Sequence, residues 1–189
     1  MSQFSIGLAG SSDFEAILAL QDQNHFNQIA EANLADGFVT TQLTDQALEA
    51  MRANTGLLVA RTGSGELLAY ACANDWDFYG ESPFQNSARA LLPLEFDGRA
   101  ITTQNSFQYG PVCVAASFRG QGVLPALLKA ICHSAAPRFE FGICFIDTRN
   151  IRSLEAHERK LGFRRMGLLP FGNVIYHMMA FKTTALCKG

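Results

Sequence analysis

Residues 106–147 hold two apolar stretches separated by a helical pattern, and this arrangement limits the possible folds of the chain more than any other feature. The first stretch, SFQYGPVCV, is interrupted by Gly110-Pro111, which predicts a bulge or a free edge because proline cannot donate to a sheet ladder. The helical pattern places five apolar side chains on one face: Val123, Leu124, Leu127, Leu128 and Ile131. The second stretch, GICFID, is continuously apolar, as in a strand buried on both faces. Together they predict a parallel, right-handed strand–helix–strand crossover from Phe107 to Asp147.

The segments before this unit predict two helices and a hairpin. Ser12-Asp13-Phe14-Glu15 has the pattern of a capping box for a helix that runs past Leu20, and Thr44 is the expected N-cap of a shorter second helix. GLLVART and ELLAYACANDWDF predict two antiparallel strands joined at Gly63-Ser64-Gly65. Residues 79–104 are less regular and predict an insertion that holds a short helix near residues 87–92.

The segments after the crossover predict one helix and a second hairpin. RNIRSLEAHERKL is a charged helical pattern closed by Gly162. FRRMGLL and VIYHMMAFK predict paired strands with a turn at residues 170–173. The expected order α-α-β-β-β-α-β-α-β-β describes a single α/β domain over residues 1–189. Its sheet is expected to be mixed and mostly antiparallel, with helices on both faces.

Composition and charge exclude several classes of partner. A chain of 189 residues with 48% hydrophobic and 17% charged residues can bury a hydrophobic core without the help of disulfides or metal ions. Its formal net charge is −2 without a run of like charges, so neither nucleic acid nor an anionic membrane is expected as a partner. The N-terminus MSQFSIGLAG lacks the basic region of a signal peptide, and no apolar run is long enough to span a membrane. The five cysteines form no metal-binding spacing and their number is odd, so we expect a cytoplasmic protein with no metal.

The loop Arg119-Gly120-Gln121-Gly122 lies where the first strand of the crossover ends and the helix begins. Pro125 lacks an N–H and is tolerated only in the first helical turn, so the helix is expected to begin near Gly122. The amides of residues 120–124 would then point out of the helix end, either as a phosphate seat or within a plain turn. The P-loop pattern is absent. A dinucleotide fingerprint would need a glycine in place of Pro125, although Asp147 could serve as its ribose-binding acid.

The chain resembles the GNAT family of acyl-CoA-dependent N-acetyltransferases in this strand, its glycine loop, the following helix and strand, and Gly162-Phe163. The resemblance is strongest from Phe107 to Phe163, and the element order extends it over nearly the whole chain. It implies a sheet whose central parallel strands splay to hold coenzyme A, with acetyl-CoA as the acyl donor. The coenzyme-binding residues that it implies are Val112, Cys113, Val114, Arg119, Gly120, Gln121, Gly122, Val123, Leu124, Asn150 and Ser153.

One departure from the family pattern concerns the general acid. The resemblance implies a tyrosine seven residues after Asn150 that protonates the departing thiolate, and this chain has His157 there. The stretch from that position to Gly162 is one residue longer than in the family pattern, so counting back from the glycine gives Glu158 instead. Both residues are therefore candidates for the acid.

Further residues near the expected site are open to two interpretations each. Tyr109 either packs in the core or reaches the acceptor pocket as a third catalytic candidate. Cys113 either packs as a small hydrophobe or acts as a nucleophile, although direct transfer needs no covalent step. Asp75, Asp77 and Glu81 either take a proton from the amine or belong to a solvated loop.

These features predict an enzyme that moves an acetyl group from acetyl-CoA to the primary amine of a small molecule by direct attack. The acceptor side is expected to be formed by the two N-terminal helices, LADGFVTTQLT and residues 75–84, which are mostly aromatic, aliphatic and uncharged. This lining favours a small amine with an apolar body, bound by a monomer or a homodimer. The alternatives are a non-catalytic acyl-CoA-binding module and a dinucleotide-binding protein.

Overall fold

The computed structural model describes residues 4–54 and 56–187, and in these ranges the chain forms a seven-stranded sheet with a small two-stranded sheet beside it. The large sheet has the order β1 (Phe4–Leu8), β2 (Leu57–Thr62), β3 (Leu67–Asn74), β6 (Ser106–Val114), β7 (Phe141–Asp147), β9 (Val174–Lys182) and β8 (Arg164–Phe171). The small sheet pairs β4 (Leu94–Phe96) with β5 (Arg99–Ile101).

The centre of the large sheet is the predicted crossover. Strands β6 and β7 are parallel, and α4 (Val123–Ala135) connects them, whereas the other neighbouring strands of the large sheet are antiparallel. The parallel pairing covers only Ser106–Gln108 against Phe141–Ile143. Beyond these residues the two strands separate, so the second half of β6 has a partner on the β3 side alone.

The bulge expected at Gly110-Pro111 is present. Ala71 of β3 lies opposite Val112 and Ala73 lies opposite Tyr109, so β6 has one more residue than β3 between these pairs. Gly110 has φ +116°, a conformation that suits glycine. The bulge sits where β6 leaves β7, and it therefore marks the start of the gap in the sheet.

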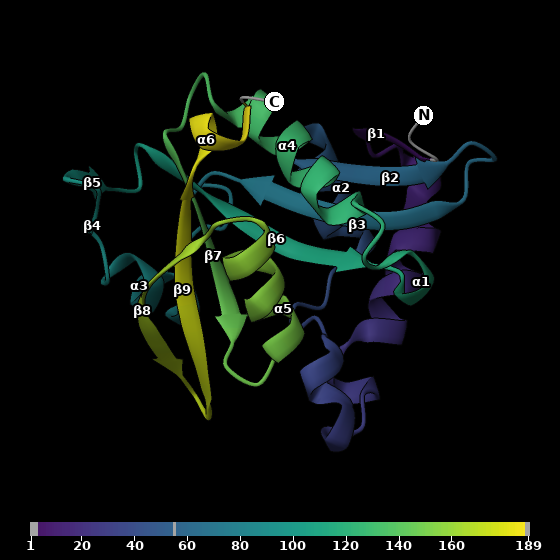
Figure 1. The fold of residues 1–189 in the computed structure, drawn as a ribbon, viewed down its shortest axis with the longest axis horizontal. Helices are drawn as coiled ribbons and strands as arrows, with labels where there is room; N and C mark the ends of the chain where they lie inside the picture. The colour runs from purple at the N-terminus through teal and green to yellow at the C-terminus, as the bar shows by residue number, and fades with distance from the viewer. Residues whose placement is uncertain (1–3, 55, 188–189) are drawn as a thin grey trace.

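Helices cover both faces of the sheet, as predicted (Figure 1). Helices α4 and α5 (Ile151–Glu155) lie on the face where Leu127 and Leu154 pack with Cys144 of β7. The opposite face is covered by α1 (Phe14–Asn24) and α2 (Asp45–Ala53) at one end. At the other end it is covered by α3 (Pro83–Arg89) and the β4–β5 hairpin.

Several elements differ from the sequence expectation. Strand β1, the β4–β5 hairpin and α6 (Thr183–Cys187) were not expected, and α3 begins four residues before the predicted helix at 87–92. The capping box expected at Ser12–Glu15 is wrong, because the 3₁₀ turn η1 (Ser11–Asp13) precedes the first helix and no side chain caps the helix itself. The Asp13 carboxylate instead accepts from the Gly10 N–H at 2.7 Å and pairs with Arg61. The predicted Thr44 cap is correct, since its hydroxyl accepts from the Ala47 N–H at 3.2 Å.

Short helical turns complete the structure: η2 (Phe26–Gln28), η3 (Glu31–Asp36), η4 (Ala116–Phe118) and the π-helix η5 (Ala156–Lys160). The first two belong to residues 25–40, which join α1 to the approach of α2 and which we call the 25–40 segment. No helix within residues 4–54 and 56–187 combines the length and the apolar character that crossing a membrane requires.

Candidate active site

The glycine loop forms an open cradle at the N-terminus of α4. Gly120 and Gly122 have φ +81° and +82°, and a Cβ built on either residue would meet nothing within 4 Å. The Ala126 N–H donates to the Gly122 carbonyl at 3.2 Å, so the amides before Ala126 have no acceptor within the helix. These amides face a cavity of about 260 Å³, which we call the coenzyme cavity. The loop can therefore bind an anion.

The coenzyme cavity gathers nearly all residues expected to bind coenzyme A. It is lined by Val112, Cys113, Val114, Arg119, Gly120, Gly122, Val123, Leu124, Asn150 and Ser153. Gln121 is not among the lining residues, because its side chain folds back and Nε2 donates to the Ser117 carbonyl at 2.8 Å. Exposed Arg152 and Lys160 also line this cavity and leave it electropositive.

The open edge of β6 supplies backbone groups to this cavity. The Ala115 N–H donates to Leu68 of β3 at 2.8 Å. Because the polar groups of successive residues in a strand point to alternate sides, those of Val114 and Val112 point away from β3 into the gap. The Val114 carbonyl there accepts from Nε of Arg119 at 3.1 Å, which leaves the Val112 and Val114 amides for an extended ligand.

The guanidinium group of Arg119 forms its hydrogen bonds with other residues of the protein. Besides the Val114 carbonyl, it donates from Nη1 to the Asp36 carbonyl at 3.1 Å and from Nη2 to Oδ1 of Asn24 at 2.7 Å. The expected charge beside the loop is therefore present, but its donors hold the 25–40 segment and the end of α1 against β6.

The 25–40 segment reaches over the gap between β6 and β7. Asn150, which caps α5 by accepting from the Ser153 N–H at 3.2 Å, also donates to the Phe38 carbonyl at 2.7 Å. Phe38 and Val39 line both the coenzyme cavity and a second cavity next to it. The sequence predicted that the stretch LADGFVTTQLT belongs to the acceptor side of the site. It did not predict that this stretch also contacts Asn150 and lines the coenzyme cavity.

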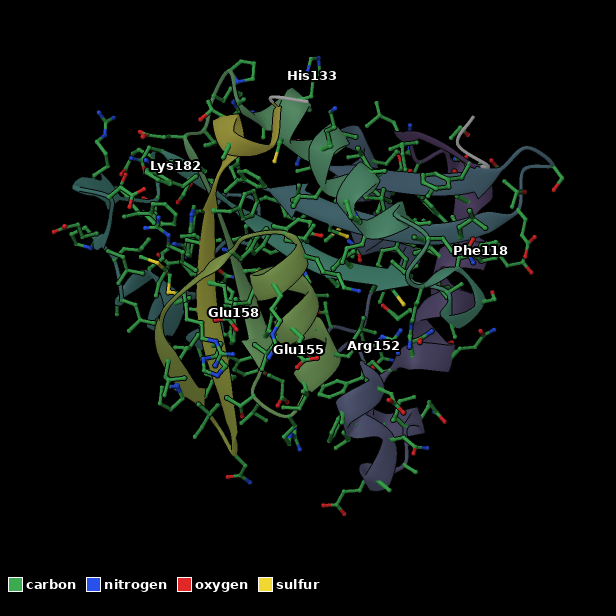
Figure 2. All side chains as sticks on the ribbon, viewed as in Figure 1. Phe118, His133, Arg152, Glu155, Glu158 and Lys182 are labelled. Atoms are coloured by element: carbon green, nitrogen blue, oxygen red, sulfur yellow. The ribbon has the colours of Figure 1, made fainter. Side chains whose placement is uncertain are left out.

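The π-helix η5 decides where His157 and Glu158 lie. The Leu161 N–H donates to the Ala156 carbonyl at 3.2 Å, five residues back, so this turn holds one residue more than an α-helix would. His157 points inward, is 3% exposed and lines both cavities. Glu158 lines neither cavity and pairs with Arg165 at 2.8 Å, on the side of the helix that faces the β8–β9 hairpin (Figure 2).

The imidazole of His157 has a defined hydrogen-bonding state. Its Nδ1 lies 2.7 Å from the Ser153 carbonyl, and because a carbonyl only accepts, Nδ1 carries the proton. Burial lowers the pKa of His157, and this effect exceeds the opposing effect of the bond to Ser153. The ring packs against Phe163 and Tyr109, with centroid distances of 5.1 and 5.8 Å. The resting group is therefore a neutral imidazole whose Nε2 has a lone pair.

The second cavity, of about 350 Å³, lies on the α2–α3 side of the gap, and we call it the acceptor cavity. Its wall is rich in aromatic side chains: Phe38, Tyr79, Phe84, Tyr109, Phe145 and Tyr176. Gln85 and Gln108 pair reciprocally in the wall, with N–O distances of 3.1 and 2.6 Å. The carboxylate of Asp147 also lines the cavity, but it accepts from the Arg149 backbone and guanidinium at 2.9, 3.0 and 2.6 Å. The wall is therefore close to neutral.

Tyr109 is both a core residue and a cavity residue. Its ring packs on Phe163 and Phe181, and the side chain also lines the acceptor cavity. Within the described residues its hydroxyl has no hydrogen-bond partner, and burial raises its pKa well above the ordinary value. The Tyr109 hydroxyl is therefore protonated at neutral pH but enclosed by protein atoms rather than open to the cavity.

Three acidic residues considered as proton acceptors do not line the acceptor cavity: Asp75, Asp77 and Glu81. Asp75 accepts from the Phe78 N–H at 2.9 Å and lies 3.5 Å from Arg138. Cys113 is buried, and burial raises the pKa of its thiol to about 12, which favours packing over nucleophilic attack. No group of three or more metal-ligating side chains occurs in the part of the chain that the structure describes.

Comparisons with known proteins agree with this geometry. The model of the acetyltransferase (GNAT) family matches residues 24–163. No curated protein matches the chain. The matched range contains the cradle, the open half of β6, Asn150 and His157.

Solved structures with a similar fold cover nearly the whole chain. An N-acetyltransferase from Staphylococcus aureus Mu50 has a TM-score of 0.63 at 19% identity, and the match covers 95% of this chain and 98% of that one. A putative acetyltransferase from Salmonella typhimurium, solved with its cofactor acetyl-CoA, has a TM-score of 0.62 at 18% identity, with coverages of 96% and 94%. Ard1 from Thermoplasma volcanium has a TM-score of 0.66 at 12% identity, with coverages of 95% and 97%. At these identities the similarity establishes the fold.

Proposed function

Because this chain belongs to the GNAT family and is an acetyl-CoA-dependent acyltransferase, we propose that it transfers acetyl groups to the primary amine of a small molecule. We further propose that residues 1–189 act as one catalytic domain. With a formal net charge of −2 and no run of like charges, the protein is expected to have no nucleic acid or membrane partner. We propose that it works in the cytoplasm as a monomer or homodimer.

The observation that carries this proposal is that the two cavities meet at His157. We propose that acetyl-CoA binds in the coenzyme cavity with its pyrophosphate on the amides at the start of α4 and its pantetheine arm along Val112–Val114. In this pose the thioester lies at the bulge end of the open edge of β6, where residues of the acceptor cavity also converge. An amine held in the acceptor cavity is then within reach of the thioester carbonyl.

The residues around this meeting point have the properties that direct acyl transfer needs. The Val112 N–H, which points into the gap, polarises the thioester carbonyl as an oxyanion donor. His157 delivers a proton to the departing thiolate, and Tyr109 positions the imidazole by packing against it. Holding both substrates in adjoining cavities supplies much of the rate through proximity.

The acceptor cavity favours a small amine with an aromatic or aliphatic body. Six aromatic rings line it, and Arg149 neutralises its buried carboxylate, Asp147. Such a wall gains from burying apolar surface and offers no acidic groove for a lysine-rich peptide or a polyamine.

The test is a competition among three acceptor pools, which are small apolar amines, polyamines and lysine-rich peptides, with acetyl-CoA as donor. Free thiol release gives the rate, and mass spectrometry identifies the acetylated amine. We expect release with the apolar amines. Binding of coenzyme A without release in any pool would favour the non-catalytic module, and preference for the peptides would contradict the acceptor class.

A further inference from the structure

The resting state of His157 raises a question about the source of the proton that it gives to sulfur. Its Nδ1–H is committed to the Ser153 carbonyl at 2.7 Å, and the ring is 3% exposed. The neutral imidazole therefore has a lone pair, and no proton, at Nε2. A residue that only acted as an acid would have to be charged before the reaction, and its burial opposes that charge.

The other titratable groups of the acceptor cavity either have their oxygens engaged by a neighbour or hold a proton. Asp147 accepts three hydrogen bonds from Arg149. Burial raises the pKa of the three tyrosines in the wall, so they are neutral donors: Tyr79, Tyr109 and Tyr176. Burial likewise raises the pKa of the Cys144 thiol. Among the described lining residues this leaves the Nε2 lone pair of His157 as the available base of suitable strength.

We propose that His157 is a proton shuttle that first takes a proton from the attacking amine and then gives that proton to the departing thiolate. The proposal rests on the proposed function and deepens it, because one residue replaces a separate base and acid. The position of His157 in the walls of both cavities is what allows it to serve both substrates.

The proton and electron balance of this cycle is complete. The neutral amine nitrogen forms a bond to the thioester carbon, and the carbonyl π electrons move to oxygen, which the β6 amide stabilises. Nε2 takes one proton from the nitrogen and the imidazole becomes an imidazolium, which keeps its Nδ1–H bond to Ser153. The oxygen electrons then restore the carbonyl, the C–S bond breaks with its electron pair on sulfur, and Nε2 returns the proton to sulfur. The products are the N-acetyl amine and the free thiol, and His157 is neutral again.

No charged group contributes to the shift of the His157 pKa, so none imposes one protonation state on the imidazole. Tyr109 of β6 and Phe163 pack against its ring, and Phe38 and Val39 of the 25–40 segment line the same cavities. The charged groups near it are paired or exposed. Asp147 pairs with Arg149, Glu158 pairs with Arg165, and Arg119 bonds Asn24 and the Asp36 carbonyl, whereas the side chains of three others are exposed: Asp36, Arg152 and Lys160. The shift of its pKa arises from burial and the Ser153 bond alone, so the imidazole can gain and lose a proton within one cycle.

The experiment is a pH profile of kcat/KM with an aromatic amine that stays neutral over the range used. A shuttle is active when unprotonated, so kcat/KM rises with pH through the lowered pKa of His157 and then stays level. A residue that acts only as an acid gives the opposite profile, because kcat/KM then falls as His157 loses its proton, and that result would overturn the proposal. The matched control is Glu155→Gln, which removes an exposed carboxylate of the same helix and should keep the wild-type profile.

Two further measurements keep the proposal apart from the proposed function. His157→Gln should retain coenzyme A binding, which shows that it folds, lose the rising limb, and slow turnover about 10²-fold. If kcat/KM of this variant still rose with pH as in the wild-type protein, the shuttle would be refuted and the acetyltransferase function would stand. Nitrogen NMR of the free wild-type protein should show neutral His157 with its proton on Nδ1 at pH 7. A proton on Nε2 would overturn the shuttle without any assay of activity, whereas a wild-type protein that acetylates no amine would overturn the proposed function as well.

Discussion

Replacing Arg119 by lysine should destabilise the protein even without coenzyme A. Lysine keeps the positive charge but loses the planar fork that joins Val114, Asp36 and Asn24 through three hydrogen bonds. A hydrogen bond to a charged group contributes about 1.5–3 kcal/mol, and lysine can keep one of the three. Because the guanidinium group is only half-buried, we take the low end for the two lost bonds, about 3 kcal/mol. For a chain of this size that loss lowers Tm by about 6–12 °C.

The assay is thermal unfolding of the free protein and of the coenzyme A complex, for Arg119→Lys and for Arg152→Lys. Arg152 is an exposed arginine of the same cavity, so its replacement by lysine should change the free energy of unfolding by about 0.5 kcal/mol or less (Figure 2). An unchanged Tm for free Arg119→Lys would refute the bracing role. Arg119 would then act through its charge on the bound phosphate, which lysine preserves.

Four further outcomes are expected. Gly122→Ala should weaken coenzyme A binding in calorimetry, because the added Cβ enters the cradle at φ +82°. The control is Gly172→Ala, at φ +56° in the β8–β9 turn, which should carry a similar backbone strain of about 1–2 kcal/mol but bind coenzyme A normally. Glu158→Gln should change the free energy of unfolding by less than about 1 kcal/mol and leave turnover unchanged, because it removes only an exposed ion pair. Iodoacetamide at pH 7 should leave Cys113 unmodified in the folded protein by mass spectrometry, since burial raises the pKa of its thiol to about 12. The pKa of His157 is lower in the folded than in the unfolded state, so its contribution to the free energy of unfolding is present above the unfolded value of 6.5 and falls as the pH drops below that value. In urea unfolding, the His157→Phe variant should therefore lose less stability than the wild-type protein as the pH is lowered.

The sequence predicted the centre of the fold well because its signals there are local. Strand β6 begins and ends at the predicted residues, and Gly110-Pro111 forms the expected bulge, since proline and glycine limit the backbone wherever they occur. Gly122 and Pro125 fixed the start of α4 for the same reason. The edge strand β1 gave no comparable signal, because it is short, only partly buried and held mainly by backbone bonds to β2.

The parts of the site that the sequence did not predict depend on distant residues. The Nδ2 group of Asn150 bonds Phe38 across 112 positions of the chain, and Arg119 bonds Asp36 across 83. Residues so far apart carry no pattern in a single sequence, so the place of the 25–40 segment over both cavities could not be derived. The ambiguity between His157 and Glu158 has a different cause, because residue counting assumes a regular helix and the π-turn breaks that period.

The gap between β6 and β7 also gives the sheet an edge at its centre. The residues of that edge, Val-Cys-Val, are apolar, and their free amides are the kind of template that recruits strands from other chains. Here α5 and the 25–40 segment cover it, and Asn150 and Arg119 hold the cover in place. We therefore expect the hydrogen bonds that shape the proposed cleft to protect the protein from aggregation as well. A variant that loses them would self-associate through its own substrate site, and coenzyme A would protect it by occupying the strand position.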